Sequence, residues 1–382
     1  MVNMSGAQAL VRQLRSEGVD TVFALPGVQV MAAFDALYEF EDAIRLIQVR
    51  HEQASTYMAD GYAKVTGKVG VALVVPGPGA LNAGAGLGTA YASSSPVLMI
   101  SGQIDSPSLG KRQGQIHEIE DQLDVFKPIT KWNHRVTRVE EIPEAVHEAM
   151  RHLKTGRPRP VELEVPSDTL AATGHAEIME PEGYSKSAGD PSEIGRAARL
   201  LAGAKKPAII AGGGTMIADA SRELLELAEF LQAPVMTTQS AKGIISEDHY
   251  LAVGVNYAMV GPAHRVVPGS DVILAVGTRF LIRDLQITES QKIIHIDADS
   301  SEIGKNYTTE IGIEADAKEG LAHLLRQLRS TTPPRESRRQ EIEGYRRTYA
   351  EEIRGLAPQQ VDMIEAIRQE LEDDAVVVSG IT

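Results

Sequence analysis

Cysteine is absent from the 382 residues. Its absence excludes disulfide bonds, thiolate metal sites and cysteine nucleophiles. Basic residues are also in deficit, with 38 Lys and Arg against 52 Asp and Glu, and the formal net charge is -14. Because no cluster of Lys and Arg is dense enough to hold a phosphate backbone, we expect no binding to nucleic acid or to an anionic membrane surface.

Long apolar runs are missing as well. The longest, such as residues 69–75, have the length of a strand rather than of a membrane span. The first eighteen residues follow an amphipathic helix pattern and contain no apolar stretch of the kind found in a signal peptide. With 43% hydrophobic and 24% charged residues, the composition predicts a folded protein of two or three domains. We expect it in the cytoplasm.

Short apolar stretches alternate with helix-sized amphipathic ones from the start of the chain. This alternation predicts crossover connections and a parallel sheet that is buried on both faces. We assign residues 1–172 to this first domain. Its predicted strands cover residues 21–25, 44–49, 69–75, 97–100 and 161–165.

A second alternating block follows a linker over residues 171–190, which are rich in Gly, Ser, Pro and acidic residues. We place this second domain at residues 191–329. Residues 339–382 contain two predicted helices and then Ala375–Val378, which has the composition of a buried strand. The predicted fold class is therefore α/β, with two doubly wound parallel-sheet domains and the first strand of a third.

Chemically informative residues follow the predicted strands of the first domain. Glu52 comes directly after one strand, at the start of a helix, where a carboxylate is also common for purely structural reasons. Glycine-rich motifs follow three other strands, at the edge where open α/β sheets bind ligands. These motifs are Pro26-Gly27, Gly77-Pro78-Gly79-Ala80-Leu81-Asn82 and Ser101-Gly102-Gln103.

The order of these three motifs and of His51-Glu52-Gln53 along the chain resembles the pyrimidine-binding domain of thiamine-diphosphate enzymes. The likeness is strongest to acetolactate synthases and benzaldehyde lyase. The resemblance implies a lyase or carboligase that acts on a small carbonyl substrate such as a 2-oxo acid. It assigns to Glu52 a hydrogen bond to the pyrimidine N1′, which promotes the 4′-imino tautomer that removes the thiazolium C2 proton. By the same likeness, Pro76, Gly77 and Asn82 line the pyrimidine pocket.

Two further residues occupy positions that face the substrate in this family. Gln29 is a candidate for steering a substrate oxygen, with a surface amide in a turn as the alternative. His117 stands where acetolactate synthases typically carry Phe and benzaldehyde lyase carries Gln. It is a candidate proton shuttle near neutral pH, and the alternative is a solvent-facing loop histidine. This departure weakens the assignment of pyruvate as the substrate.

The second domain resembles the central domain of the same family, which holds FAD in acetolactate synthases and ADP or nothing in other relatives. The run Gly212-Gly213-Gly214 does not have the GxGxxG spacing of a dinucleotide site. Two aspartates expected after Arg279 are replaced in the sequence Phe280-Leu281-Ile282-Arg283. This favours an empty, structural domain. If FAD or ADP does bind, the matching positions are Arg157, Gly213, Arg279 and Asp297.

The GDG motif, through which these enzymes hold Mg²⁺ and the cofactor's diphosphate in a third domain, does not occur in the 382 residues. We therefore expect no metal ligands here, and a chain that is inactive without that third domain. The family's architecture implies a homodimer or a homotetramer. The alternative is a non-catalytic binding or regulatory module, or one half of a split thiamine-diphosphate enzyme.

Overall fold

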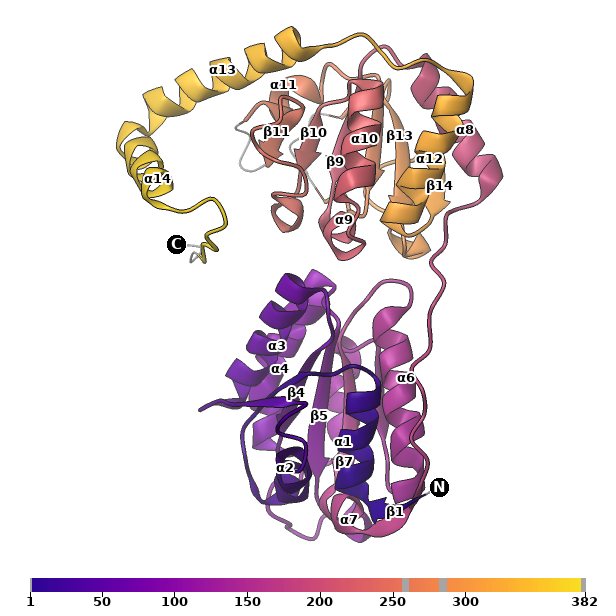
Figure 1. Ribbon diagram of the computed structural model, residues 1–382, viewed down its shortest axis with the longest axis vertical. Coiled ribbons are helices and arrows are strands. Elements are labelled where there is room, and N and C mark those ends of the chain that lie inside the picture. The colour runs from indigo at the N-terminus through magenta and orange to yellow at the C-terminus, as the bar shows by residue number, and fades with distance from the viewer. Residues whose placement is uncertain (1, 256–260, 282–286, 379–382) are drawn as a thin grey trace. The chain divides into compact units, whose positions relative to one another are not determined.

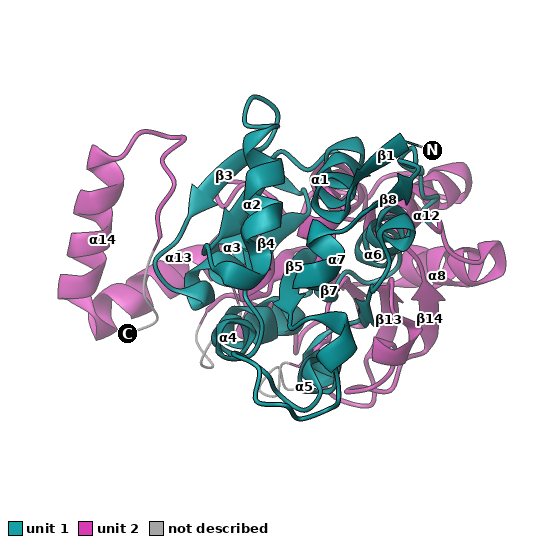
Figure 2. Cartoon of the chain, turned by 90° about the horizontal axis from the view of Figure 1, so that it is seen from below, with its two compact units in different colours: residues 1–186 teal, residues 187–382 magenta. Residues whose placement is uncertain are grey.

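The computed structural model describes residues 2–255, 261–281 and 287–378 (Figure 1). The chain divides into two compact units, residues 1–186 and 187–382, which are coloured separately in Figure 2. Each unit contains a six-stranded parallel sheet, in agreement with the predicted α/β class.

The first unit is built on a sheet with the strand order β3-β2-β4-β5-β7-β6. Its strands are β2 (Thr21–Ala24), β3 (Arg45–Gln48), β4 (Gly70–Val74), β5 (Val97–Gln103), β6 (Trp132–Arg135) and β7 (Val161–Pro166). Its helices are α1 (Gly6–Ser16), α2 (Met31–Tyr38), α3 (Glu52–Thr66), α4 (Pro78–Ser93), α5 (Gln122–Phe126), α6 (Ile142–Lys154) and α7 (Ser167–Ala171).

Helices cover both faces of this sheet (Figure 1). Successive side chains of a strand point to opposite faces. Val71 and Leu73 of β4 therefore join one core with residues of α1, α2 and α6, whereas Ala72 and Val74 join a second core with residues of α3 and α4. Burial on both faces explains why β4 is continuously apolar.

The first unit extends into the segment predicted to be a linker. Thr173–Ala176 forms a strand, β8, which pairs antiparallel with β1 (Val2–Ser5). The backbone hydrogen bonds of this small ribbon depend on pairing between the two ends of the unit. A local reading of composition does not reveal such pairing.

Glycine in α4 allows this helix to approach α3 closely. A Cβ atom on Gly86 would lie 2.3 Å from Thr56 Oγ1 and 2.8 Å from the backbone nitrogen of Tyr57. The Thr56 hydroxyl also donates a hydrogen bond of 2.7 Å to the Ala83 carbonyl, which fixes this crossing. Gly86 of α4 thus serves packing within the chain.

We predict that Gly86→Ala lowers the free energy of unfolding by about 2 kcal/mol, because the added methyl group overpacks the contact between α3 and α4. Gly88→Ala is the matched control in the same helix, since no atom lies within 4 Å of its Cβ position. It should raise stability by about 0.5–1 kcal/mol through helix propensity. Urea denaturation of both variants measures the difference, and equal effects would contradict the packing account.

The second unit has the strand order β11-β10-β9-β12-β13-β14. Numbered within the unit, this is the order of the classic dinucleotide-binding sheet, 3-2-1-4-5-6. Its strands are β9 (Pro207–Ala211), β10 (Val235–Thr237), β11 (Ala252–Val255), β12 (Val272–Val276), β13 (Lys292–Asp297) and β14 (Ile311–Glu314). Its helices include α8 (Pro191–Gly203), α9 (Gly213–Ile217), α10 (Ser221–Leu231), α11 (Ala263–Val266) and α12 (Ala317–Thr331).

Two further helices, α13 (Arg339–Leu356) and α14 (Pro358–Glu370), follow the sheet of the second unit. The strand predicted at Ala375–Val378 does not form. Val376 and Val378 are 81% and 91% exposed, and no described strand pairs with them. The prediction was wrong because apolar composition alone does not make a strand without a neighbour to complete its hydrogen bonds.

Candidate functional site

The site of the first unit lies at the carboxyl edge of its sheet, between β2 and β4. The strand order reverses at this point, where open α/β sheets bind their ligands. The segment after β2 reaches the segment after β4, since a Cβ atom on Gly27 would lie 2.4 Å from Val75 Cγ1. Two of the motifs that are separate in sequence are therefore neighbours in space.

Glu52 is the first residue of α3. His51, in an extended conformation, precedes the helix and accepts a 3.2 Å hydrogen bond from the Gln53 backbone N–H on its Nδ1 atom. The Glu52 side chain is half-buried and accepts a 3.0 Å hydrogen bond from Asn82 Nδ2 on Oε2. Its Oε1 atom faces Gly79, 3.3 Å from where a Cβ atom would stand. The structure thus brings Glu52 and Asn82 together.

The loop that begins α4 is held in a conformation that requires glycine. Gly77 has a φ of 57°, and a Cβ atom there would lie 2.3 Å from the His117 carbonyl oxygen. Its N–H donates a 2.8 Å hydrogen bond to Gln122 Oε1. Pro76 and Gly77 are both buried. Any larger residue at position 77 would displace the His117 backbone.

Gln29 and His117 each carry a buried polar atom without a hydrogen-bond partner among the described residues. These atoms are Gln29 Oε1 and His117 Nδ1. Gln29 Nε2 donates a long, 3.4 Å bond to the Ile116 carbonyl, so the two segments are adjacent. His117 also has a positive φ of 70° and is half-buried. Unpaired buried polar atoms and a strained backbone are features of ligand sites, where a bound group completes the hydrogen bonds.

A cluster of buried polar side chains lies directly behind this loop. It consists of Ser101, Gln122, Glu162 and Glu164, none of which exposes measurable surface. Burial, and then the charge of Glu164, raise the pKa of Glu162 to about 8. Burial also raises the pKa of Glu164, and the Arg135 guanidinium opposes that shift. This cluster was not predicted from the sequence. The feature that could have indicated it is the pair of glutamates, Glu162 and Glu164, at alternate positions of an otherwise apolar strand.

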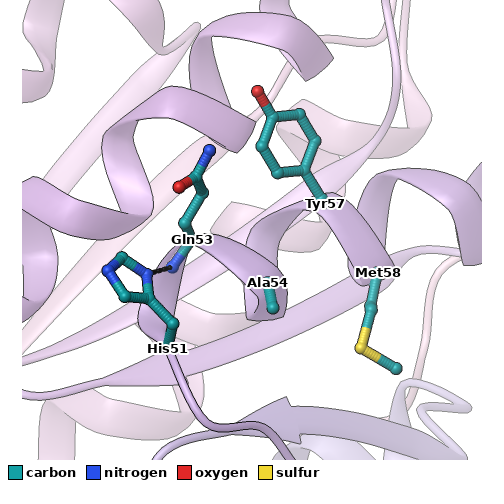
Figure 3. Close-up of a pocket in the computed structure, with 5 residues that line it drawn as sticks. All are labelled: His51, Gln53, Ala54, Tyr57 and Met58. Atoms are coloured by element: carbon teal, nitrogen blue, oxygen red, sulfur yellow. Dashed lines mark hydrogen bonds between the residues drawn. The ribbon is translucent and has the colours of Figure 1, made fainter. Parts of the chain in front are cut away.

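An open pocket of about 400 Å³ lies at the N-terminal end of α3 (Figure 3). In the figure, the Gln53 side chain lies between His51 and Tyr57. The residues that line the pocket are His51, Gln53, Ala54, Tyr57 and Met58. They belong to the Glu52 motif, and the sequence analysis assigned them no role.

The candidate nucleotide positions belong to both units. Gly213 follows β9 and Asp297 is the last residue of β13, both at the carboxyl edge of the second sheet, and Arg279 is exposed. Arg157 belongs to the first unit, where its Nε donates a 2.9 Å bond to Ser94 Oγ. Of the stretch after Arg279, Ile282 and Arg283 lie outside the described residues.

The consecutive glycines of the second unit serve backbone packing. A Cβ atom on Gly212 would lie 2.3 Å from the Gly277 carbonyl oxygen, and one on Gly214 would lie 2.7 Å from Gly277 Cα. The loops after β9 and β12 therefore touch backbone to backbone at the switch point of this sheet. This contact explains the glycines without a nucleotide.

Two features are absent from the part of the chain that the structure describes. No group of three or more His, Cys, Asp or Glu side chains in this part of the chain is arranged to hold a metal ion. Within residues 2–255, 261–281 and 287–378, no helix combines the length and the hydropathy that a membrane crossing requires.

Comparison with known families and proteins confirms the resemblance drawn from the motifs. Residues 4–125 match the N-terminal TPP binding domain of thiamine pyrophosphate enzymes, and residues 194–324 match their central domain. The chain is 42% identical over 340 residues to the "Probable acetolactate synthase large subunit" of Methanocaldococcus jannaschii. The aligned residues cover 84% of this chain and 56% of that protein.

Two other relatives show the range of the similarity. The acetolactate synthase isozyme 3 large subunit of Escherichia coli is 35% identical over 405 residues, which cover 100% of this chain and 69% of that protein. The "Probable 2-ketoarginine decarboxylase AruI" of Pseudomonas aeruginosa is 37% identical over 327 residues, which cover 84% of this chain and 58% of that protein. The chain thus spans little more than half the length of several curated relatives.

Proposed function

Because the chain belongs to the thiamine pyrophosphate enzyme family, we propose that it provides the pyrimidine-binding half of the active site in a thiamine-diphosphate-dependent lyase or carboligase. The proposed substrates are 2-oxo acids or related carbonyl compounds, as the names of the acetolactate synthase and 2-ketoarginine decarboxylase relatives suggest. The observation that carries the proposal is the position of the Glu52 carboxyl group, held by Asn82 beside the switch point of the sheet.

The residues present fit the pyrimidine part of this cofactor. Gly27, Gly77 and Gly79 let the loops beside Glu52 pack closely, since a Cβ atom there would approach Val75 or the His117 carbonyl oxygen to 2.4 Å or less. The unpaired Gln29 Oε1 and His117 Nδ1 atoms leave hydrogen bonds for a bound group to complete. The bound cofactor would supply the carbanion chemistry. Glu52 would hold a proton on its carboxyl group and share it with a ring nitrogen, while Asn82 fixes the direction of that carboxyl group.

Gln29 and His117 would act on the substrate side of the site. We propose that the unpaired Gln29 Oε1 and His117 Nδ1 atoms contact the substrate's polar groups. A histidine ring nitrogen can donate or accept a hydrogen bond, so a buried and unpaired Nδ1 atom is free to meet a polar group of a bound molecule. This arrangement supports the proton-shuttle hypothesis for His117 over a purely solvent-facing role.

We propose that the contacts to Mg²⁺ and the diphosphate come from residues other than these 382, which contain no GDG motif. We propose that residues 1–382 alone are catalytically silent and bind thiamine diphosphate weakly, since Glu52 can activate only a cofactor that is held in place. The missing motif also supports an alternative, in which the chain is a non-catalytic module or one half of a split enzyme.

The direct test is to incubate the complete protein with thiamine diphosphate, Mg²⁺ and a panel of 2-oxo acids, and to follow CO₂ release and new carbon–carbon bonds. We expect turnover with at least one donor. Binding of the cofactor without any turnover would favour the non-catalytic alternative. Turnover only after addition of a second chain that contains GDG would favour the split enzyme.

We predict that the purified protein is colourless, because Gly212 and Gly214 are packed against Gly277 and the two aspartates expected between Arg279 and the next arginine, Arg283, are missing. The measurement is an absorbance spectrum between about 350 and 500 nm, where flavins absorb, recorded after heat has released any bound group. A yellow protein with stoichiometric flavin would contradict this, and would place FAD at Gly213, Arg279 and Asp297.

We predict that residues 1–382 self-associate as a homodimer, with a homotetramer as the alternative. Apolar side chains on α3 and α4 remain accessible, with Tyr57, Met58 and Leu81 at 41%, 39% and 49% exposure, and such patches are typical of protein interfaces. Light scattering should give about twice the chain mass of 41.2 kDa. A clean monomer whose mass does not change with concentration would refute the prediction.

A further inference from the structure

Gln122 links the Gly77 loop to the buried polar cluster. Its side chain is fully buried and uses both ends of its amide. The Oε1 atom accepts the Gly77 N–H at 2.8 Å. The Nε2 atom lies 3.0 Å from Ser101 Oγ, 3.2 Å from the Gly102 carbonyl and 3.1 Å from Glu164 Oε2, and donates toward all three. One glutamine therefore connects the loop after β4 with strands β5 and β7.

The cluster permits only one orientation of this amide. The Gly102 carbonyl and a Glu164 carboxylate are acceptors, so they require the NH₂ group on their side. Glu164 is held in turn by Arg135, which donates to its Oε1, and Ser101 is held by a 2.7 Å hydrogen bond to Glu162 Oε1. The carbonyl oxygen of Gln122 must therefore point at Gly77.

The Gly77 loop has little freedom to move independently of Gln122. The Gly77 Cα is packed against the His117 carbonyl. On the neighbouring strand, a Cβ atom on Gly102 would lie 3.0 Å from Pro76 Cδ and 2.9 Å from Val30 Cγ1. A shift of the Gln122 amide would thus be passed to Gly77 and to the backbone of His117.

We propose that Gln122 is a positioning residue of the active site, and that the buried Glu162–Ser101–Glu164 cluster sets the place of the Gly77 loop through it. The consequence for cofactor binding rests on the proposed function. The mechanical link between Gln122 and Gly77 does not, because it follows from hydrogen bonds within the chain.

The cluster also makes this link sensitive to protons. The charged groups around it are Glu162, Glu164, Arg135 and Asp121, of which Arg135 contacts both Glu164 and Asp121, the latter at 3.3 Å. A neutral Glu162 leaves one carboxylate opposite one guanidinium in the interior. Loss of the Glu162 proton would add a second buried negative charge beside Ser101 and Glu164 and disturb the bonds that orient Gln122.

The test is hydrogen–deuterium exchange of the Gly77 amide in wild type and in Gln122→Met, which removes both ends of the amide at similar volume. Gln13→Met is the matched control. Gln13 is another fully buried glutamine of this unit, and it bonds the Met179 backbone at 2.8 and 3.2 Å without touching the loop. If Gln122→Met does not fold, Gln122→Asn withdraws the acceptor from Gly77 while it keeps the polar group.

We expect the protection factor of the Gly77 amide to fall about tenfold or more in the Gln122 variant and to stay within about twofold in the Gln13 variant at matched overall stability. In wild type, protection corrected for intrinsic exchange should decline as the pH rises through 8, and Glu162→Gln should abolish that decline. Equal protection in the two glutamine variants, or a Gly77 amide that is unprotected in wild type, would overturn the inference.

Cofactor affinity provides the second readout, measured by calorimetry on the complete protein. Gln122→Met should raise the Kd for thiamine diphosphate about tenfold, with no such change for Gln13→Met. If the wild-type protein binds no cofactor, the proposed function fails while the exchange result still decides the Gln122 link. If wild type binds and both variants bind equally well, the inference fails and the proposed function stands.

Discussion

Glu52→Gln is expected to slow exchange of the C2 proton of bound thiamine diphosphate by about two orders of magnitude or more. Glutamine can still accept the hydrogen bond from Asn82, which lies 3.0 Å from Glu52 Oε2, so the fold and the loop should be retained. It cannot hold a proton for the pyrimidine ring. Quenched-flow deuterium exchange, read by proton NMR on the complete protein, measures the rate.

Glu144→Gln is the control for this experiment, because Glu144 is an exposed carboxylate in the first turn of α6. It should leave the exchange rate unchanged. A Glu52→Gln protein that exchanges the C2 proton at the wild-type rate would remove Glu52 from the site and with it the proposed mechanism.

Glu162→Gln is expected to change how stability depends on pH. Burial raises the pKa of Glu162 to about 8 from an unfolded value of 4.5, so the folded chain retains a proton that the unfolded chain has lost. The stability that this group contributes is complete below pH 4.5 and is lost as the pH rises through 8. The wild-type free energy of unfolding should therefore fall by a few kcal/mol across that window relative to the variant.

Urea denaturation of residues 1–382 between about pH 5 and pH 9, a range that covers most of this window, measures the difference. Glu148→Gln is the control. The hydrogen bond from Arg151 lowers the pKa of Glu148 below its usual 4.5, so the contribution of this group changes only at lower pH, and the variant should run parallel to wild type across the measured range. Parallel curves for wild type and Glu162→Gln would show that Glu162 is ionised in the folded protein at neutral pH.

Much of the fold could be predicted from the sequence because strands buried on both faces are continuously apolar. The stretch 69–75 matches β4 for this reason. The position of Glu52 could be predicted as well, since a residue that follows a parallel strand lies at the ligand-binding edge. Ala375–Val378 has the same apolar character, but the structure leaves these residues exposed without a partner. Whether an apolar segment forms a strand depends on an adjacent strand that completes its backbone hydrogen bonds, and not on its composition alone.

The buried cluster could not be predicted because its members are distant in sequence. Gln122 and Gly77 are 45 residues apart, and Ser101 and Glu162 are 61 residues apart. Each is an ordinary polar residue in its local context. The register of β5 with β7, in which Ser101 pairs with Glu164, brings Ser101 to the two glutamates, and the packing of α5 brings Gln122 to them. The strand β8 was missed for the same reason.

We propose that Glu52 contacts the pyrimidine ring of thiamine diphosphate at the β2–β4 switch point. The most direct measurement is a crystal structure of the complete protein with thiamine diphosphate and Mg²⁺. We expect a ring nitrogen about 2.6–3.2 Å from a Glu52 carboxylate oxygen. The pyrimidine ring should also contact Gly77 and Asn82. A cofactor bound with its pyrimidine away from Glu52 would contradict the account.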